Sequence, residues 1–470
     1  MKYTPHKYQE RMQNFVIEHP YCALLVSMGM GKTVTTLTAI ANLFDEMSIS
    51  RVLVVAPKVV AESTWAQECR KWDHLSGLRV SVVMGSAIQR GKALAQDADI
   101  YVTSRDLFVW LTGQGKWKFD VVVLDELTSF KTSSSKRFKA FKGVRPYIRR
   151  VIGLTGTPTP NGLKDLWAQM YCIDMGQRLG RSKTRYMNEN FDLFVRNNIT
   201  IKATLKAGKE EEIYRKIGDI ALTMKAEDYL DVPPVIEIEQ RVELSESVMK
   251  SYRQLERDCV MEFSSLAEDG ASGTVVASSA AALTNKLLQF ANGAIYSSCD
   301  AELSEGKRTW YFTHHEKLDA LIELIELAQA GGESVLVFYQ FQHDYERAMN
   351  RKEIYTLRCR KYSGNADFEA WNNGEVDVLF THAASTAYGL NLQQGGHVII
   401  WYGTGWNAEL YLQGDARLAR QGQTHPTRVY KLICSGTVDE DAANAVSGKI
   451  ASQEAMLQSL KRLQNKYQNN

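Results

Sequence analysis

The sequence contains few residues that would interrupt or cross-link a folded chain. Only nine of its 470 residues are proline, below the usual ~5%, and no low-complexity run occurs, so we expect no long disordered linker. Its seven cysteines include no Cys-x-x-Cys pair, which excludes that type of metal or redox site and is typical of a reducing cytosol. No run of about 18 apolar residues occurs, and the N-terminus has no apolar signal-peptide core, so we expect neither a membrane span nor secretion.

The chain also has little excess charge of either sign. Lysine and arginine number 56 against 54 aspartate and glutamate residues, which gives a formal net charge of +2. This balance excludes a globally basic nucleic-acid coat protein, so any DNA or RNA surface must be built locally. At roughly 100–200 residues per domain, the length predicts two large domains or about three smaller ones.

The sequence does contain a repeated alternation of short apolar runs with helical patterns. Each run is rich in β-branched or aliphatic residues, as expected of buried strands in βαβ units. In the first third of the chain the runs lie at 22–26, 52–56, 80–84, 100–103, 121–124 and 151–154. Later runs lie at 334–338, 376–380, 397–401 and 428–433. The predicted fold class is therefore α/β, with two parallel-sheet lobes.

Between these lobes the pattern becomes helical. Residues 245–265 favour a long amphipathic helix, 271–282 is a small-residue segment predicted to be a loop, and helix resumes at 283–290. The strongest punctuation is Asp-Val-Pro-Pro at 231–234, because proline removes a backbone donor and restricts the residue before it. The predicted domains are lobe 1 over 1–230 with a helical protrusion at about 165–225, lobe 2 over 231–446 with one at about 245–295, and a C-terminal helix and tail over 447–470.

The turn after the first predicted strand has the composition of a phosphate loop. It continues Gly-x-Gly-Lys-Thr into a helical segment, although the first glycine of the strict Gly-x4-Gly-Lys-Ser/Thr pattern would fall on Val26. Glycines let backbone N–H groups close around phosphate oxygens, and the helix N-terminus adds positive potential. In this pattern the lysine reaches the β- and γ-phosphates and the threonine holds Mg²⁺. The alternative is a glycine-rich turn that only starts a helix. The predicted nucleotide-binding residues of this turn are Met28, Gly29, Met30, Gly31, Lys32 and Thr33.

Two acidic residues follow the predicted strand at 121–124. Acids at the carboxyl end of a buried strand are costly without a cation. Asp125 is predicted to coordinate Mg²⁺, directly or through water, and Glu126 to polarise an attacking water. The alternative is an N-cap for the next helix. The lysine loop earlier in the chain favours the catalytic interpretation, because the two motifs are complementary halves of one nucleotide site.

With these motifs the sequence resembles the helicase-superfamily-two ATPases, and within them the Swi/Snf-type double-stranded DNA translocases. The family's acidic box, Asp-Glu-x-His-x-x-Lys, corresponds to 125–131, and its Thr-Gly-Thr-Pro-x-x-Asn motif to 155–161. In the second lobe, 335–341, Gly-Leu-Asn-Leu at 389–392 and Gln-x-x-x-Arg-x-x-Arg-x-Gly-Gln at 413–423 resemble family motifs. All fixed residues of the last motif are present.

The sequence also departs from the family pattern. Thr128 stands where the family has histidine, and Val26-Ser27 stands where it usually has Asp-Glu. Residues 385–387 replace an Ala-Gly-Gly motif, and Ala416 replaces an aspartate that often precedes the first motif arginine. These departures indicate a divergent member.

The resemblance implies two RecA-like lobes with helical insertions, ATP and Mg²⁺ as cofactors, and DNA as partner, for which we expect duplex DNA. It implies that Gln9 reads adenine, that Gly389 and Gln413 contribute to the nucleotide site, and that Arg417 and Arg420 act as arginine fingers. The spacing of these arginines predicts that both lie on one face of a helix. The residues in or near segments that hold the nucleic acid are Lys58, Ser104, Lys131, Thr157, Ser385 and Thr386.

Local basic clusters support a polyanionic partner. Residues 127–150 contain eight lysines and arginines and no acid, and a second group lies at 178–185. Such clusters suit sequence-independent phosphate contacts, although a solvated surface is the alternative. Trp65 and Trp72, at helical spacing, favour core packing over base stacking.

Three functions are compatible with these patterns. The first is a DNA-stimulated ATPase that translocates on duplex DNA in replication, repair or recombination. The second is a strand-separating or branch-migrating DNA or RNA helicase, and the third is a nucleotide-gated DNA-binding scaffold. Intact Glu126, Arg417 and Arg420 argue against the scaffold. We expect a monomeric cytoplasmic protein of a bacterium or a phage-infected host, since the motor motifs span most of the length.

Overall fold

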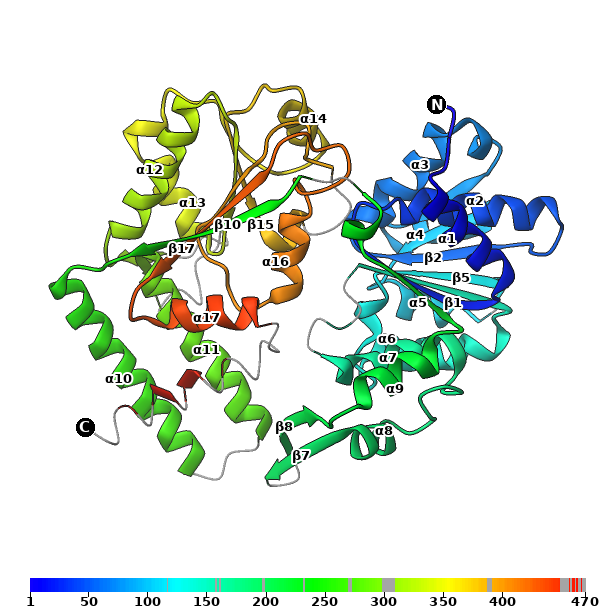
Figure 1. Ribbon diagram of the computed structural model, residues 1–470, viewed down its shortest axis with the longest axis horizontal. Helices are drawn as coiled ribbons and strands as arrows, with labels where there is room; N and C mark the ends of the chain where they lie inside the picture. Colours follow the sequence, from blue (N-terminus) through cyan, green and yellow to red (C-terminus); the bar gives the residue numbers. More distant parts are fainter. Residues whose placement is uncertain are drawn as a thin grey trace. The chain divides into compact units, whose positions relative to one another are not determined.

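The computed structural model describes two units, each built around a parallel sheet (Figure 1). Unit 1 comprises Met1–Phe194 and Lys202–Asp231, and unit 2 comprises Val195–Ile201 and Val232–Asn470. The described residues are 1–115, 117–156, 159, 162–196, 199–230, 233–268, 273–297, 309–386, 391–448, 456, 459, 460, 462, 463 and 466.

The sheet of unit 1 has seven strands in the order β3-β4-β2-β5-β6-β1-β9, and every paired neighbour runs parallel. The strands are β1 (Tyr21–Val26), β2 (Val52–Ala56), β3 (Val80–Val83), β4 (Ile100–Ser104), β5 (Val121–Asp125), β6 (Arg150–Thr155) and β9 (Ala221–Met224). The first six confirm the strands predicted from apolar runs. β9 was not predicted, and it forms the edge beside β1.

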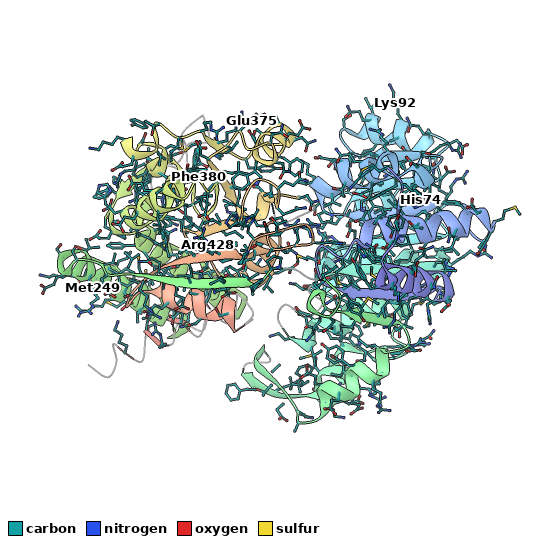
Figure 2. The ribbon with its side chains drawn as sticks, turned by 45° about the horizontal axis from the view of Figure 1, so that its top comes forward. His74, Lys92, Met249, Glu375, Phe380 and Arg428 are labelled. Carbon is teal, nitrogen blue, oxygen red and sulfur yellow. The ribbon has the colours of Figure 1, made fainter. Side chains whose placement is uncertain are left out.

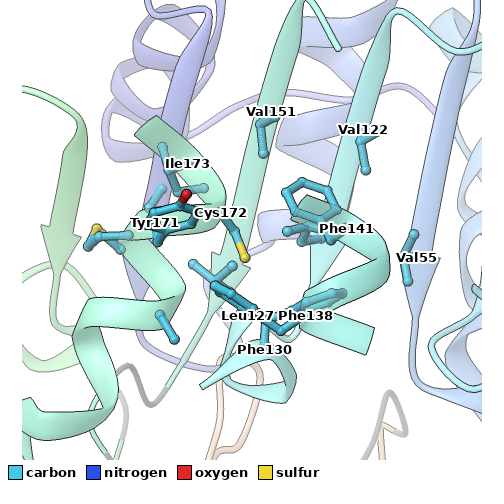
Figure 3. Close-up of a cluster of buried hydrophobic side chains, with 14 of the residues drawn as sticks. Val55, Val122, Leu127, Phe130, Phe138, Phe141, Val151, Tyr171, Cys172 and Ile173 are labelled. Atoms are coloured by element: carbon cyan, nitrogen blue, oxygen red, sulfur yellow. The ribbon is translucent and has the colours of Figure 1, made fainter. Parts of the chain in front are cut away.

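Helices connect these strands. They are α1 (Lys7–Glu18), α2 (Lys32–Asp45), α3 (Trp65–Lys71), α4 (Ala87–Ala95), α5 (Phe108–Thr112), α6 (Lys136–Val144), α7 (Leu166–Asp174), α8 (Lys183–Asn190) and α9 (Lys209–Ile217). α6 and α7 cover one face of the sheet, where Phe141 and Cys172 pack towards Val122 and Val151 (Figure 3). This core continues into Leu127, which directly follows the predicted acid pair.

The sheet of unit 2 has six strands in the order β10-β17-β16-β13-β15-β14, again parallel. They are β10 (Val235–Val242), β13 (Val335–Tyr339), β14 (Cys359–Lys361), β15 (Val378–His382), β16 (Val398–Trp401) and β17 (Thr427–Cys434). β13, β15, β16 and β17 were predicted, whereas β10 and β14 were not. Phe380 of β15 is buried, and Glu375 in the preceding loop is exposed (Figure 2).

The helices of unit 2 are α10 (Glu246–Glu268), α11 (Gly273–Asn292), α12 (Glu316–Ala330), α13 (Gln342–Met349), α14 (Asn365–Asn372), α15 (Ala383–Thr386), α16 (Ala408–Asp415) and α17 (Val438–Ser447). Apolar side chains of α10, α11 and α17 share one core, which includes Tyr252, Leu287 and Val438. A two-stranded antiparallel sheet joins β11 (Ala294–Tyr296) to β12 (Trp310–Phe312). Across the described ranges, no helix is long and apolar enough to cross a membrane.

Two predictions about the middle of the chain were wrong. The segment 271–282 was predicted to be a loop, but from Gly273 onwards it forms the first half of α11. Its small residues are alanine and serine, which a helix accepts when its neighbour supplies packing. The stretch 165–225 is only partly helical, because it also contains a two-stranded sheet of β7 (Phe191–Arg196) and β8 (Ile199–Leu205). Apolar and polar residues alternate in β8, which is the period of a half-exposed strand.

Candidate active site

Three neighbouring strands of unit 1 end at one edge of the sheet, and each carries a predicted motif. In the parallel register Leu25 of β1 pairs with Thr155 of β6, and Leu154 of β6 pairs with Asp125 of β5. The phosphate loop, the acid pair and the Thr-Gly motif therefore begin at the same level. Open α/β sheets bind ligands in the crevice outside the carboxyl ends of their strands.

The loop after β1 has the backbone shape of a phosphate-binding turn. Gly29 and Gly31 have φ of 80° and 78°, a left-handed region that glycine enters without steric cost. Met30 between them is buried and anchors the turn. α2 begins at Lys32, whose Nζ donates to the carbonyls of Val26 (2.7 Å) and Ser27 (3.0 Å). The lysine is thus held over the loop, beside the N-terminus of the helix.

Gln9 packs directly against this loop. Its Nε2 donates to the Met30 carbonyl at 3.3 Å, and its Oε1 accepts from the His6 N–H at 3.0 Å. A Cβ on Gly31 would come within 2.5 Å of Gln9 Nε2, so the glycine is required for this contact. The structure therefore places Gln9 where it stabilises the loop.

Asp125 ends β5 and is fixed by a tryptophan from another segment. Trp65 Nε1 donates to Asp125 Oδ2 at 2.9 Å, and the Trp65 side chain is fully buried. A π-helical turn at Val60–Thr64 precedes Trp65 at the start of α3. Such turns are rare and frequent at functional sites. Burial raises the pKa of Asp125, while the Trp65 hydrogen bond and the Lys32 charge act in the opposite direction.

Glu126 is held in a strained conformation by two hydroxyl groups. Its φ of 62° is unusual for a residue with a side chain, and such strain costs about 1–3 kcal/mol. Thr128 and Thr155 each donate from Oγ1 to Glu126 Oε1 at 2.8 Å. Leu127 is fully buried directly after it, and burial of one leucine contributes about 1.5–3 kcal/mol, so core packing can offset the strain.

The residues at this edge fit a magnesium–nucleotide complex. A carboxylate from Asp125 and a hydroxyl from Thr33 are the oxygen ligands that Mg²⁺ accepts when substrate phosphates supply the rest. Gly156 packs against the loop as well, since a Cβ there would lie 2.8 Å from Met28 Cγ. The glycines therefore keep the backbone close around the space next to Lys32.

Sequence reasoning missed part of this site. Trp65 was predicted to be a core residue, and it is buried, but its indole also binds Asp125. From the sequence, Thr128 was recognised only as a replacement for histidine. In the structure its hydroxyl donates a hydrogen bond to the Glu126 carboxylate. The adjacency of Trp65 could not be read from a period-based pattern, because the π-helical turn changes the direction of the side chain that follows.

In unit 2, the arginine segment (residues 417–420) lies directly after α16. α16 ends at Asp415, and residues 416–420 form turns, so the prediction that both arginines lie on one helix face was wrong. Arg417 is buried, with its Nε donating to the Gln413 carbonyl at 2.8 Å, and Gln413 is also buried. Arg420 is half-buried. Gly389 lies outside the described residues.

The residues expected to hold nucleic acid differ in exposure. The Lys58 side chain is exposed and lies 3.9 Å from Glu62, and Ser385 is exposed on α15. Ser104 is buried, and its Oγ accepts from the Leu107 N–H, which disfavours a direct contact through this hydroxyl. Lys131 is half-buried after the acidic box. Thr157 and the side chain of Thr386 lie outside the described residues.

The basic cluster at 127–150 divides into surface and structural members. Lys136, Lys139, Lys142 and Arg149 are exposed. Arg145 is buried and donates to the carbonyls of Cys172 (2.9 Å) and Ile148 (3.3 Å). Arg137 binds the carbonyls of Arg105 and Ser129. In the second group, Arg178 is paired with Asp219 at 2.6 Å. The cluster is therefore only partly a surface that could meet phosphates.

The fold and this arrangement define a helicase-like ATPase core. A model of the SNF2-related domain matches residues 8–292, more than half of the chain, and a model of the helicase conserved C-terminal domain matches residues 316–422. The chain belongs to the SNF2-related family, which confirms the resemblance seen in the sequence.

Several known proteins are similar to the chain. Putative protein p41 of Acyrthosiphon pisum secondary endosymbiont phage 1 is 32% identical, over 98% of this chain and 99% of the phage protein. The CHD3-type chromatin-remodeling factor PICKLE of Arabidopsis thaliana is 24% identical, over 97% of this chain and 34% of PICKLE. The human DNA excision repair protein ERCC-6-like is 26% identical, over 88% and 38%. The chain thus spans about a third of the length of these two eukaryotic relatives.

A solved structure, the Sulfolobus solfataricus SWI2/SNF2 ATPase core in complex with dsDNA, aligns over 95% of this chain and 92% of its own. Its sequence identity is 23% and its TM-score is 0.45.

Proposed function

We propose that the chain hydrolyses ATP with Mg²⁺, that duplex DNA stimulates this hydrolysis, and that the cycle moves the protein along the duplex. The observation that carries the proposal is the convergence of Lys32, Asp125 and Glu126 at the carboxyl ends of β1 and β5, the two strands that flank β6. Phosphoryl transfer needs positioning and charge stabilisation more than covalent chemistry. These groups supply both, and a scaffold without turnover would not need Glu126 in a strained conformation.

The roles follow from the geometry of unit 1. The N–H groups of the loop and Lys32 would bind the phosphates, and Thr33 with Asp125 would hold Mg²⁺. When bound, Mg²⁺ neutralises charge on the phosphates. Glu126 would orient the attacking water, because hydrogen bonds from Thr128 and Thr155 fix its carboxylate. Arg417 and Arg420 would stabilise the charge on the γ-phosphate in a closed state, and a finger of this kind contributes about 10³–10⁵ in rate.

Nucleic-acid contacts complete the proposal. Lys58, Lys131 and Ser385 would contact backbone phosphates, together with Thr157 and Thr386. Alternation between closed and open states would then produce stepping. The similarity to PICKLE and to ERCC-6-like supports a role in DNA remodelling or repair.

The test is ATP turnover with and without duplex DNA. We expect duplex to increase kcat, and Lys32→Ala and Glu126→Gln to abolish turnover. Glu375→Gln, which removes an exposed carboxylate in unit 2, is the control and should leave the rate unchanged (Figure 2). Absence of stimulation by any DNA would contradict the proposal.

Strand separation is a second candidate, favoured by one observation. Phe194 lies on β7 of the β7–β8 hairpin and is 62% exposed. Base–aromatic stacking stabilises by about 1–3 kcal/mol per base. If the hairpin parts strands, Phe194→Ala should reduce unwinding of a forked duplex while leaving duplex-stimulated ATPase intact. Triplex displacement without any fork unwinding would instead support translocation alone.

A further inference from the structure

The arginine segment of unit 2 is held at both ends. After it, Gln423 Nε2 donates to the carbonyls of Gln393 (3.2 Å) and Gly396 (3.0 Å). Before it, Asp415 accepts at Oδ1 from Trp401 Nε1 at 2.8 Å. The backbone carbonyl of Asp415 also accepts from the N–H groups of Leu418 (3.2 Å) and Ala419 (3.0 Å), so the position of Asp415 is transmitted directly into the segment.

Trp401 is a rigid support for this contact. It ends β16, is almost fully buried, and stacks on Phe338 with ring centroids 4.2 Å apart and an interplanar angle of 17°. A Cβ on Gly414 would lie 2.6 Å from Trp401 Cζ2, so only glycine lets the end of α16 approach the indole this closely. The sheet thereby fixes where α16 ends and where the arginine segment begins.

We propose that Asp415, bound by the indole of Trp401, is a positioning residue for Arg417 and Arg420. The catalytic part of this proposal rests on the proposed ATP hydrolysis. Asp415 lies two residues before Arg417, and its carboxylate is turned into the core. A buried carboxylate is less favourable than a well-packed apolar residue, which argues for a role beyond packing.

The surroundings of Asp415 make this contact responsive to pH. Glu237 of β10, Tyr411 of α16 and Lys431 of β17 face the carboxyl group. Lys431 Nζ donates to Glu237 Oε2 at 2.5 Å and lies 4.9 Å from the Tyr411 ring centroid. Burial raises the pKa of Asp415 to about 7, against the effect of the Trp401 hydrogen bond. Hydrogen bonds to a charged acceptor are roughly twice as strong as neutral ones, so the segment should be held more firmly above about pH 7 than below it.

The experiment compares three variants of the full chain. Trp401→Phe removes the indole N–H, and Asp415→Asn keeps an acceptor oxygen without the charge. Trp310→Phe is the matched control, because Trp310 Nε1 also donates to a carboxylate of unit 2, Glu346 Oε2 at 2.9 Å. The first readout is hydrogen exchange of peptides covering 416–423, corrected for intrinsic rates, at about pH 6 and about pH 8. The second is the pH profile of kcat with duplex DNA.

We expect protection of 416–423 to rise with pH in the wild-type chain and in Trp310→Phe. Asp415→Asn should show no rise, and Trp401→Phe should shift it to higher pH, because the indole hydrogen bond lowers the pKa of Asp415. Loss of this hydrogen bond should lower kcat by about 10-fold to 100-fold, with the KM for ATP nearly unchanged, since unit 1 binds the nucleotide.

Protection that is independent of pH in the wild-type chain, or that falls equally in Trp310→Phe, would overturn the proposal. If Trp401→Phe does not fold, the pH response of Asp415→Asn decides alone. If the wild-type chain shows the expected exchange pattern but hydrolyses no ATP, the proposed function is contradicted. The positioning of the segment by Asp415 is then still established.

Discussion

Units 1 and 2 each hold an aspartate with the indole of a tryptophan, half-buried Asp125 in unit 1 and buried Asp415 in unit 2. Trp65 binds Asp125 at 2.9 Å in unit 1, and Trp401 binds Asp415 at 2.8 Å in unit 2. Burial raises both pKa values. Lys32 counters this effect at Asp125, whereas Glu237 reinforces it at Asp415. The same hydrogen bond therefore holds a proposed Mg²⁺ ligand beside Lys32 in one unit and a carboxyl group with a pKa of about 7 beside Glu237 and Lys431 in the other.

The two units also position their functional groups by different means. In unit 1 the groups follow strand ends, and a strained Glu126 is retained because neighbouring residues are locked in the core. In unit 2 the arginines lie in turns, which the side chains of Asp415 before them and of Gln423 after them help to hold in place. Turns are easier to displace than strand ends, so unit 2 is the better place for a group that must act only in part of a cycle.

The largest effect is expected from Arg420→Ala, which tests the different roles of the two units. If unit 2 contributes only to the hydrolytic step, kcat should fall by about 10³ while ATP affinity stays within about twofold. Lys32→Ala should instead lose both. Nucleotide binding by fluorescence and steady-state turnover separate the two outcomes. Arg358→Ala, at an exposed pair with Asp377, is the control. Weakened ATP binding in Arg420→Ala would refute the division between the units.

A smaller effect is expected from Trp65→Phe. Removing the indole N–H should let the Asp125 carboxylate rotate, and loss of such a supporting contact typically costs about 10–100-fold in metal affinity. Mn²⁺ binding in the presence of nucleotide, measured by electron paramagnetic resonance, reports this directly. Trp72→Phe is the matched control, because Trp72 Nε1 donates to Glu68 Oε2 at 2.6 Å. Equal Mn²⁺ affinity in both variants would show that Trp65 only packs.

The smallest effect concerns stability and tests the charge difference between the aspartates. The pKa of Asp415 is about 7 in the folded chain, above the ~3.9 of an unfolded aspartate. The folded chain therefore binds more protons between these values, and the free energy of unfolding falls as pH rises through about 7. Asp415→Asn avoids this loss, so its Tm should exceed that of the wild-type chain by a few °C at about pH 8. The difference should vanish near about pH 4. If the Tm of Asp415→Asn exceeded that of the wild-type chain only at low pH, the pKa of Asp415 would be lowered on folding, not raised.

How much of the fold could be predicted depended on burial. Strands buried on both faces, such as β2 and β5, are continuous apolar runs and were found from the sequence. β10 was missed because it is an edge strand whose Val235 and Ile236 remain exposed, and β14 because it has only three residues. The first half of α11 was missed because alanine and serine carry no periodic apolar signal, and its partner helix α10 supplies the packing.

For the candidate site, the phosphate loop and the acid pair were predicted from contiguous motifs with a fixed chemical requirement, and the two arginines from the resemblance to the family. It could not find partners that lie far along the chain. Trp65 is separated from Asp125 by 60 positions, and Trp401 reaches Asp415 only through the packing of Gly414. The candidate functional groups were thus set by local sequence motifs. Their orientation, their charge state and the strain at Glu126 were decided by the tertiary structure, since these depend on which side chains the sheet brings together in a medium of low polarity.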